Sequence, residues 1–183
     1  HPSEYISLTS PKEEVISNSI RDLSSHAELF DLIGLPQSYD APLNIHCRQD
    51  GDPETVSSSF LKNFDKLPDN VKNRLVLEVN DNREGSWSVK NLHKFYYQRA
   101  NIPVTFDNLH HSFCHHDVPE REAMDMAHST WNTTPVFHYS EGIDGTRKHA
   151  DYALRSPPDY DKEVFWDVEL KAKDLAIFKM LNK

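Results

Sequence analysis

Short apolar runs rich in β-branched and aromatic residues recur along the chain, each ending at or near an ionisable residue. The runs cover residues 42–47, 74–79, 102–107, 134–140 and 163–172. Runs of this length and composition predict buried β-strands. Residues 4–8, with the sequence EYISL, form a further short run that is compatible with either a strand or a loop.

Segments with apolar residues at helical spacing lie between these runs. They cover residues 10–36, 52–67, 88–100, 118–131 and 173–183. In the first segment we expect Ser10 as the N-cap, Pro11 as the first helical residue and Glu13 closing a capping box. Ser88 is the expected cap of the third segment. Strands that alternate with such helices predict βα units and a parallel sheet.

Residue types that bind metals stand near the carboxyl ends of the predicted strands: His46, Glu78, Asp107, His138 and Glu169. Successive members are about 30 residues apart, the length of one βα unit. In a parallel barrel such residues meet at one rim, where TIM-barrel active sites lie. A doubly wound open sheet would concentrate its site at one switch point instead. We therefore predict an α/β fold, a partial (β/α)8 barrel of the TIM type with about five to six βα units.

The segment FDNLHHS, residues 106–112, places a carboxylate and histidines across one tight turn. Asp107 and His110 offer a hard oxygen and an imidazole nitrogen to a metal ion. A polar surface turn has the same composition, so this segment alone is a weak signal. The other strand-end residues strengthen it, because burying several ionisable groups without a counter-charge is costly. A divalent cation supplies that charge, and we predict a metal site.

The composition is that of an ordinary globular protein of 183 residues, with 37% hydrophobic and 27% charged residues. No apolar stretch approaches the roughly 18 residues of a membrane span, and no signal peptide is visible, so we expect no membrane partner. Cys47 and Cys114 cannot form a disulfide framework, which suits a reducing, cytoplasmic location. The net charge of −9 argues mildly against binding nucleic acid by bulk electrostatics alone. A site that gathers carboxylates around divalent cations looks acidic in the sequence, but its net negative charge falls when the ions bind.

Seven segments, in order, resemble motifs of the UV damage endonuclease family. They are HPSEYISLTSPKEEV (1–15), NIHCRQDGDPE (44–54), RLVLEVND (74–81), IPVTFDNLHH (102–111), VFHYSEG (136–142), HADYA (149–153) and DVELKAKDLAI (167–177). The resemblance runs the whole length of the chain, and the order and spacing of the motifs make it specific. It implies that residues 1–183 are one C-terminal portion of a TIM-barrel endonuclease domain, with a barrel like those of xylose isomerase and endonuclease IV.

For function, the resemblance implies cleavage of the DNA backbone immediately 5′ of a pyrimidine photoproduct. The implied partner is UV-damaged double-stranded DNA, and the implied cofactors are about two or three divalent metal ions, most often Mn²⁺. The matching metal ligands are His1, His46, Glu78, Asp107, His110, His138 and His149. Of these, the resemblance makes Glu78, Asp107 and His138 the catalytic residues, acting through a metal-bound water.

The resemblance also implies contacts with DNA. Tyr5 matches a wedge residue that fills the gap left by a flipped lesion, and Glu4 stands where the family has a glutamine. Arg147 and Lys148, directly before His149, are candidates for phosphate binding. The alternative reading is ordinary: a half-buried aromatic ring and solvated surface charges.

The chain departs from the family pattern at the last strand and at its beginning. The expected strand-end glutamate aligns with Lys171, while Glu169 lies two residues earlier on the same face. Either Glu169 replaces that ligand, or Lys171 neutralises part of the cluster. About three further βα units would precede His1 in a complete barrel. A chain without them has open parallel edges, through which self-association is possible. Such a chain either is a fragment of a longer enzyme or is completed by a partner chain, and we favour the fragment.

Other functions stay open at this point. An abasic-site endonuclease of the endonuclease IV type, or a sugar isomerase, would use similar strand-end residues on the same barrel. A fragment that binds metal without catalysis is the alternative from a different class.

Neither cysteine is an expected nucleophile. Cys47 should face away from His46 on its strand, and Cys114 with the two histidines that follow it should be solvated.

Overall fold

The structure, a computed structural model, describes residues 2–3, 5–82, 85–158 and 160–182. Within these residues there are five strands: β1 (Leu43–His46), β2 (Leu75–Glu78), β3 (Val104–Thr105), β4 (Val136–Tyr139) and β5 (Phe165–Val168). All pairings between them are parallel, with β1, β2 and β3 in one sheet and β4 and β5 in a second. A parallel bridge links the two sheets, because His138 N donates to Phe106 O at 2.9 Å beside Asp107.

The strands therefore follow one another in chain order, from β1 to β5, with helical segments in the crossovers. This order is that of a partial TIM barrel and confirms the predicted fold class. Among the described residues, β1 and β5 pair with another strand on one side each. Self-association through these edges stays a prediction.

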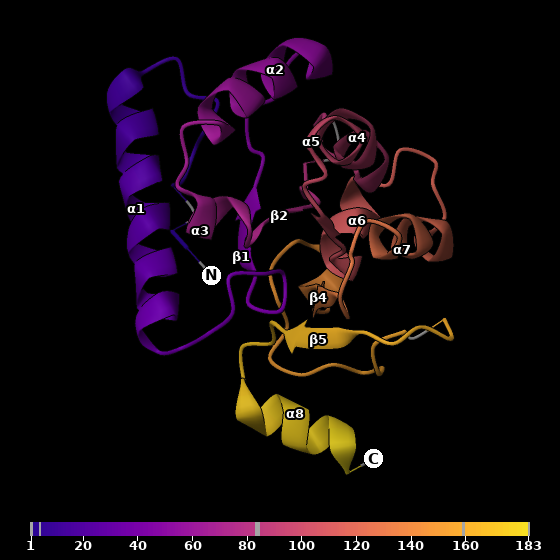
Figure 1. Cartoon of the computed structure of the whole chain (residues 1–183). Coiled ribbons are helices and arrows are strands. Elements are labelled where there is room, and N and C mark those ends of the chain that lie inside the picture. Colours follow the sequence, from indigo (N-terminus) through magenta and orange to yellow (C-terminus); the bar gives the residue numbers. More distant parts are fainter. Residues whose placement is uncertain (1, 4, 83–84, 159, 183) are drawn as a thin grey trace.

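Helices surround the strands, with the long α1 beside β1 and α8 beside β5 (Figure 1). Their bounds are α1 (Glu13–Leu32), α2 (Pro53–Phe64), α3 (Asp69–Lys72), α4 (Val89–Leu92), α5 (Gln98–Ala100), α6 (Asn108–Phe113), α7 (Glu120–His128) and α8 (Asp174–Leu181). A π-helical turn, η1 (His93–Tyr97), joins α4 to α5, and a 3₁₀ turn, η2 (Ile143–Gly145), follows β4. In the described part of the chain, no helix is both long and apolar enough to cross a bilayer.

The first helix begins later than predicted. α1 starts at Glu13, and its N-cap residue Lys12 makes no capping bond through its side chain. The Ser10 hydroxyl instead accepts from Lys12 N at 3.2 Å. The predicted capping box is wrong, because the turn before the helix already uses the Ser10 side chain. Ser88 does cap α4, where its hydroxyl accepts from Asn91 N at 3.4 Å.

The start of the chain contains no strand between residues 5 and 8. Ile6 N donates to Ser3 O at 3.2 Å, which closes a turn. Ile6 and Leu8 are nevertheless buried, and they belong to the main apolar core. The short apolar run therefore reflects burial against the core and not strand pairing.

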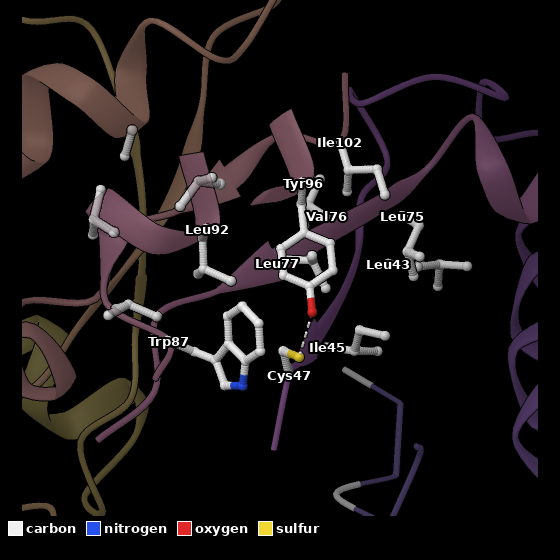
Figure 2. Packing of buried hydrophobic residues seen from close by; sticks show 14 of the residues in the cluster. Leu43, Ile45, Cys47, Leu75, Val76, Leu77, Trp87, Leu92, Tyr96 and Ile102 are labelled. Carbon is white, nitrogen blue, oxygen red and sulfur yellow. Dashed lines mark hydrogen bonds between the residues drawn. The ribbon is translucent and has the colours of Figure 1, made fainter. Parts of the chain in front are cut away.

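The apolar core lies between the strands and the helices (Figure 2). Figure 2 shows Trp87 and Tyr96 around Cys47, whose thiol shares a hydrogen bond with the Tyr96 hydroxyl at 2.9 Å. Burial raises the pKa of the Cys47 thiol to about 12, so this thiol is neutral. Cys47 thus points into the core and away from His46, as predicted.

The second cysteine differs from its prediction. Cys114 is fully buried, with its Sγ 3.8 Å from Gly85 O, while His115 and His116 are exposed. The short helix α6, which the hydrophobic pattern did not predict, ends at Phe113 and turns Cys114 inward. The prediction that Cys114 is solvated is therefore wrong. It treated Cys114 like the two histidines that follow it, but only the histidines are exposed.

Candidate metal centre

Strand register brings four of the predicted metal ligands to one end of the parallel strands. His46 and Glu78 are paired at the ends of β1 and β2, and Asp107 is bridged to His138 on β4. Residues in register on neighbouring strands point to the same side of a sheet. His110 reaches the same place from the first turn of α6. We call these five residues the strand-end cluster.

Glu78 lies at the centre of the strand-end cluster and is only 1% exposed. Its Oε2 is 3.5 Å from His46 Nε2 and 3.2 Å from His138 Nδ1. Its Oε1 is 3.1 Å from His110 Nδ1. Asn44 donates a side-chain N–H to the same Oε2. Both oxygens of this carboxylate thus face imidazoles, an arrangement in which nitrogen and oxygen donors can share a cation.

Asp107 has two roles that explain its three-residue spacing to His110. Its Oδ1 caps α6 by accepting from His110 N at 2.7 Å. The cap holds His110 in the first turn of the helix, with its ring beside Glu78. Its Oδ2 is buried and has no hydrogen-bond partner among the described residues. An unsatisfied buried oxygen is costly, and a cation at this place would remove that cost.

Three residues of the strand-end cluster, Asp107, His110 and His138, hold protons more tightly than isolated side chains do. Burial raises the pKa of Asp107 to about 6, although the nearby charge of His110 acts in the opposite direction. Burial disfavours the charged form of His110 and His138, but the carboxylate of Glu78 outweighs it and raises their pKa values to about 10 and about 9. Protons on the imidazoles therefore balance the buried carboxylates. Metal binding releases protons from ligands of this kind, so a divalent ion can replace them.

Two overlapping groups have donor atoms close enough to share an ion. One consists of His46, Glu78 and His110, and the other of Glu78, Asp107 and His138. Within each group the donor atoms lie within 4.8 Å of one another. The donors are imidazole nitrogens and carboxylate oxygens, a mixed set that suits divalent ions such as Mn²⁺ or Zn²⁺. Together with the unsatisfied Asp107 oxygen, these distances show that the residues fit divalent metal ions.

Glu169, and not Lys171, reaches the strand-end cluster. Glu169 Oε1 is 3.4 Å from His138 Nδ1, and its Oε2 is 3.9 Å from His149 Nε2. Its backbone N donates to Tyr139 O at 2.9 Å, which continues the β4–β5 pairing beyond the end of β5. Lys171 follows in a turn and is exposed. The side chains of Glu169 and His149 are each 28% exposed, so they form the solvent-facing edge of the centre.

The predicted DNA contacts lie outside the buried part of the centre. Tyr5 is 80% exposed and borders a cavity of about 230 Å³ against α1. Arg147 is exposed and forms an ion pair with Asp81, with Nη1 at 3.4 Å from Oδ1. Lys148 is exposed in the loop after η2. Two further predicted residues lie outside the described part of the chain, the metal ligand His1 and the DNA contact Glu4.

Asn44 and the polar lining of a neighbouring cavity were not predicted. Asn44 Nδ2 bonds to Glu78 and lies 3.5 Å from His138 Nε2. The signal for it was its position two residues before His46 in an otherwise apolar strand, because alternate strand residues share a face. A cavity of about 420 Å³ opens beside the cluster, lined by His46, Arg48, Asp50, Asn80, Asp81, Asn82 and His110.

The whole chain, residues 1–183, matches a family described as UV-endonuclease UvdE. It is 36% identical over 188 residues to a UV DNA damage endonuclease of Nostoc sp., an alignment that covers 97% of this chain and 55% of the relative. It is 33% identical to a UV-damage endonuclease of Neurospora crassa over 100% of this chain and 30% of the relative. The chain thus spans little more than half of one relative and less than a third of the other.

Solved structures show a corresponding likeness in the backbone. The crystal structure of SacUVDE matches with a TM-score of 0.82 and 32% identity, over 100% of this chain and 65% of that chain. A D-psicose 3-epimerase from Clostridium cellulolyticum H10, solved with D-tagatose, matches with a TM-score of 0.54 and 16% identity. That alignment covers 76% of this chain and 50% of the epimerase. At this identity the epimerase supports the fold alone.

Proposed function

Because the chain belongs to the UV-damage endonuclease family, we propose that it forms the metal-binding part of an endonuclease that cuts DNA at UV photoproducts. The observation that carries the proposal is the strand-end cluster, in which Glu78 is surrounded by three histidines beside the unsatisfied oxygen of Asp107 among the described residues. Divalent ions held at such sites activate water and stabilise charge on the attacking and leaving oxygens of a phosphodiester.

The residues of the centre have distinct parts in this proposal. Glu78 belongs to both groups of donor atoms and would bridge them. His46 and His110 complete the first group, and Asp107 and His138 complete the second. Glu169 and His149 extend the donor set at the exposed edge, which gives about two or three ions in all, with Mn²⁺ as the proposed metal. His1, matched through the resemblance, is proposed as a further ligand.

The proposed substrate is UV-damaged double-stranded DNA, cut immediately 5′ of the photoproduct to leave a 3′-hydroxyl and a 5′-phosphate. Glu78, Asp107 and His138 are the proposed catalytic residues, because their donor atoms lie within 4.8 Å of one another and would hold an ion that activates water. Arg147 and Lys148 are exposed directly before His149 and would hold phosphates near this edge. The proposal places the activity inside the cell, where the DNA is.

Nicking of supercoiled plasmid tests the reaction. With Mn²⁺ present, we expect UV-irradiated plasmid to be converted to the nicked form. Unirradiated plasmid should stay supercoiled because it carries no photoproduct. Irradiated plasmid with a chelator should stay supercoiled because the buried carboxylates and histidines then lack the ions. An end-labelled duplex with one photoproduct should be cut directly on its 5′ side.

Nicking of other DNA substrates, an aldose-conversion assay and Mn²⁺ calorimetry separate the alternatives. Cutting of abasic DNA with no preference for irradiated DNA would favour the abasic-site endonuclease. Conversion of an aldose would favour the sugar isomerase. Tight binding of Mn²⁺ in calorimetry with no nicking of any DNA would favour a metal-binding fragment without catalysis and would overturn the proposal for this chain.

Tyr5→Ala should weaken recognition of the lesion. The Tyr5 ring is exposed, and stacking of an aromatic ring on a base contributes roughly 1–3 kcal/mol. We therefore expect nicking of irradiated plasmid to fall about 10- to 100-fold, while Mn²⁺ affinity is unchanged. Tyr5→Phe keeps the ring and serves as the control, with nicking close to that of the unaltered chain. Equal activity of the alanine and phenylalanine variants would rule out the wedge.

A further inference from the structure

Strand β5 leads into α8 through a short turn (Figure 1). A further cavity lies at this turn, at the exposed edge of the candidate metal centre. It has a volume of about 360 Å³ and is lined by His149, Glu169, Leu170, Lys171 and Lys173. Two of these residues belong to the proposed donor set, and two are exposed lysines. In the described part of the chain, no residue forms an ion pair or hydrogen bond with either lysine ammonium. Two unpaired cations therefore stand next to a carboxylate and an imidazole of the centre.

Lys173 has a backbone conformation that lysine rarely adopts. Its φ is +52° and its ψ is −125°, and it directly precedes the first turn of α8. Its backbone N donates to Leu170 O at 3.0 Å, and its carbonyl accepts from Ala176 N at 3.0 Å. The tight turn from β5 into α8 thus depends on this conformation. Glycine makes such a turn with less strain, because it has no Cβ.

The turn alone does not explain why a lysine stands at this strained position, because glycine would fit the turn better. A function of the lysine side chain does explain it. Strained residues persist where the surrounding structure holds them and are concentrated at functional sites. The lysine ammonium is a compact point charge that binds phosphate and, when protonated, has no lone pair for a metal ion. The chain as a whole carries a net charge of −9, so an approaching phosphate needs local positive charge at the centre.

We propose that Lys173, assisted by Lys171, binds a phosphate of the DNA backbone beside Glu169 and positions the strand at the metal centre. This inference rests on the proposed function, because it takes DNA as the substrate. It gives Lys171 a part as well: the lysine at the place of the expected glutamate supplies charge to the phosphate, while Glu169 faces the histidines.

The test compares Lys173→Gly with Lys62→Ala, which removes the same charge from an exposed position on α2. The measurements are the thermal midpoint, Mn²⁺ affinity by calorimetry, and binding of irradiated duplex by fluorescence anisotropy over a range of salt concentrations. For Lys173→Gly we expect a higher thermal midpoint, unchanged Mn²⁺ affinity, about tenfold weaker DNA binding and a salt dependence reduced by about one phosphate contact. Lys62→Ala should bind DNA like the unaltered chain.

If Lys173 had only a structural role, Lys173→Gly would not raise the thermal midpoint and weaken DNA binding at the same time. Lys171→Ala leaves the strained turn as it is and should weaken DNA binding with no gain in thermal midpoint. The inference is overturned on its own if the unaltered chain binds irradiated DNA and Lys173→Gly binds it equally well, or loses no more than Lys62→Ala. If the Mn²⁺-loaded unaltered chain neither binds nor nicks irradiated DNA, the proposed function falls and this inference falls with it.

Discussion

Glu78→Gln is expected to abolish nicking and to lower Mn²⁺ affinity by more than about 100-fold. Loss of a residue that only hydrogen-bonds to a metal ligand costs roughly 10- to 100-fold, and Glu78 is itself a proposed ligand. Glu78 is common to both groups of donor atoms, so its loss affects both. Glutamine has almost the same shape as glutamate, but it is neutral. It presents an N–H group to histidines that face a carboxylate in the unaltered chain. The change therefore removes the negative charge and one of the two shared ligand oxygens without emptying the volume of the side chain.

Calorimetric titration with Mn²⁺ and plasmid nicking together measure this effect. Glu28→Gln provides the matched control, because Glu28 is exposed on α1 and carries the same charge. The control should keep both Mn²⁺ affinity and nicking. Thermal unfolding in chelator shows whether Glu78→Gln is folded, which separates a lost site from a lost fold. A folded Glu78→Gln variant that binds Mn²⁺ as tightly as the unaltered chain would exclude Glu78 as the bridging residue.

Arg74→Met is expected to give the largest loss of stability. The Arg74 side chain is fully buried at the start of β2. Its Nε and Nη2 donate to Pro36 O and Leu35 O, each at 2.9 Å, and its Nη2 lies 2.8 Å from Asp31 Oδ1. Hydrogen bonds from Asn70 and from Arg74 hold the pKa of Asp31 below its usual value. The guanidinium thus joins the end of α1 and the chain that follows it to the strand that carries Glu78.

Methionine fills much of the same volume but leaves these carbonyls without their donor. It also removes one donor from the Asp31 carboxylate, which keeps its hydrogen bonds from Asn70 and Gln37. Leaving a buried backbone carbonyl without its donor costs about 1–3 kcal/mol, and Arg74 supplies more than one such carbonyl. For a domain of this size that corresponds to a fall of roughly 10 °C in the thermal midpoint. Calorimetric or circular-dichroism melts measure it. Arg21→Met, on the exposed face of α1, is the control and should change stability by no more than about 0.5 kcal/mol. Equal melting of the two variants would show that Arg74 is not a structural tie.

Much of the candidate metal centre follows from local spacing along the chain. Polar residues at the ends of successive strands predict a common rim, because parallel strands end together and each βα unit returns the chain to the same edge. His46 and Glu78 are in register as this requires. The spacing of Asp107 and His110 is set by one helical turn, in which the carboxylate caps the backbone N–H of the histidine. These relations depend on backbone geometry alone, so a single sequence is enough to predict them.

The rest of the centre depended on contacts between distant segments. Glu169 reaches His138, and Lys171 does not, because pairing with β4 continues just beyond β5 and then gives way to a turn. The hydrogen bond from Asn44 to Glu78 depends on the pairing of β1 with β2, which the sequence alone does not show.

The errors have the same origin. The expected capping box at Ser10 and the expected exposure of Cys114 were local inferences that packing overruled. What the sequence determined by itself was the type, order and spacing of the donor residues, since these follow from the periods of strands and helices. Which of two neighbouring side chains reaches the centre, and which polar groups lose water, was decided by the tertiary structure, since both depend on where each strand stops and what packs against it.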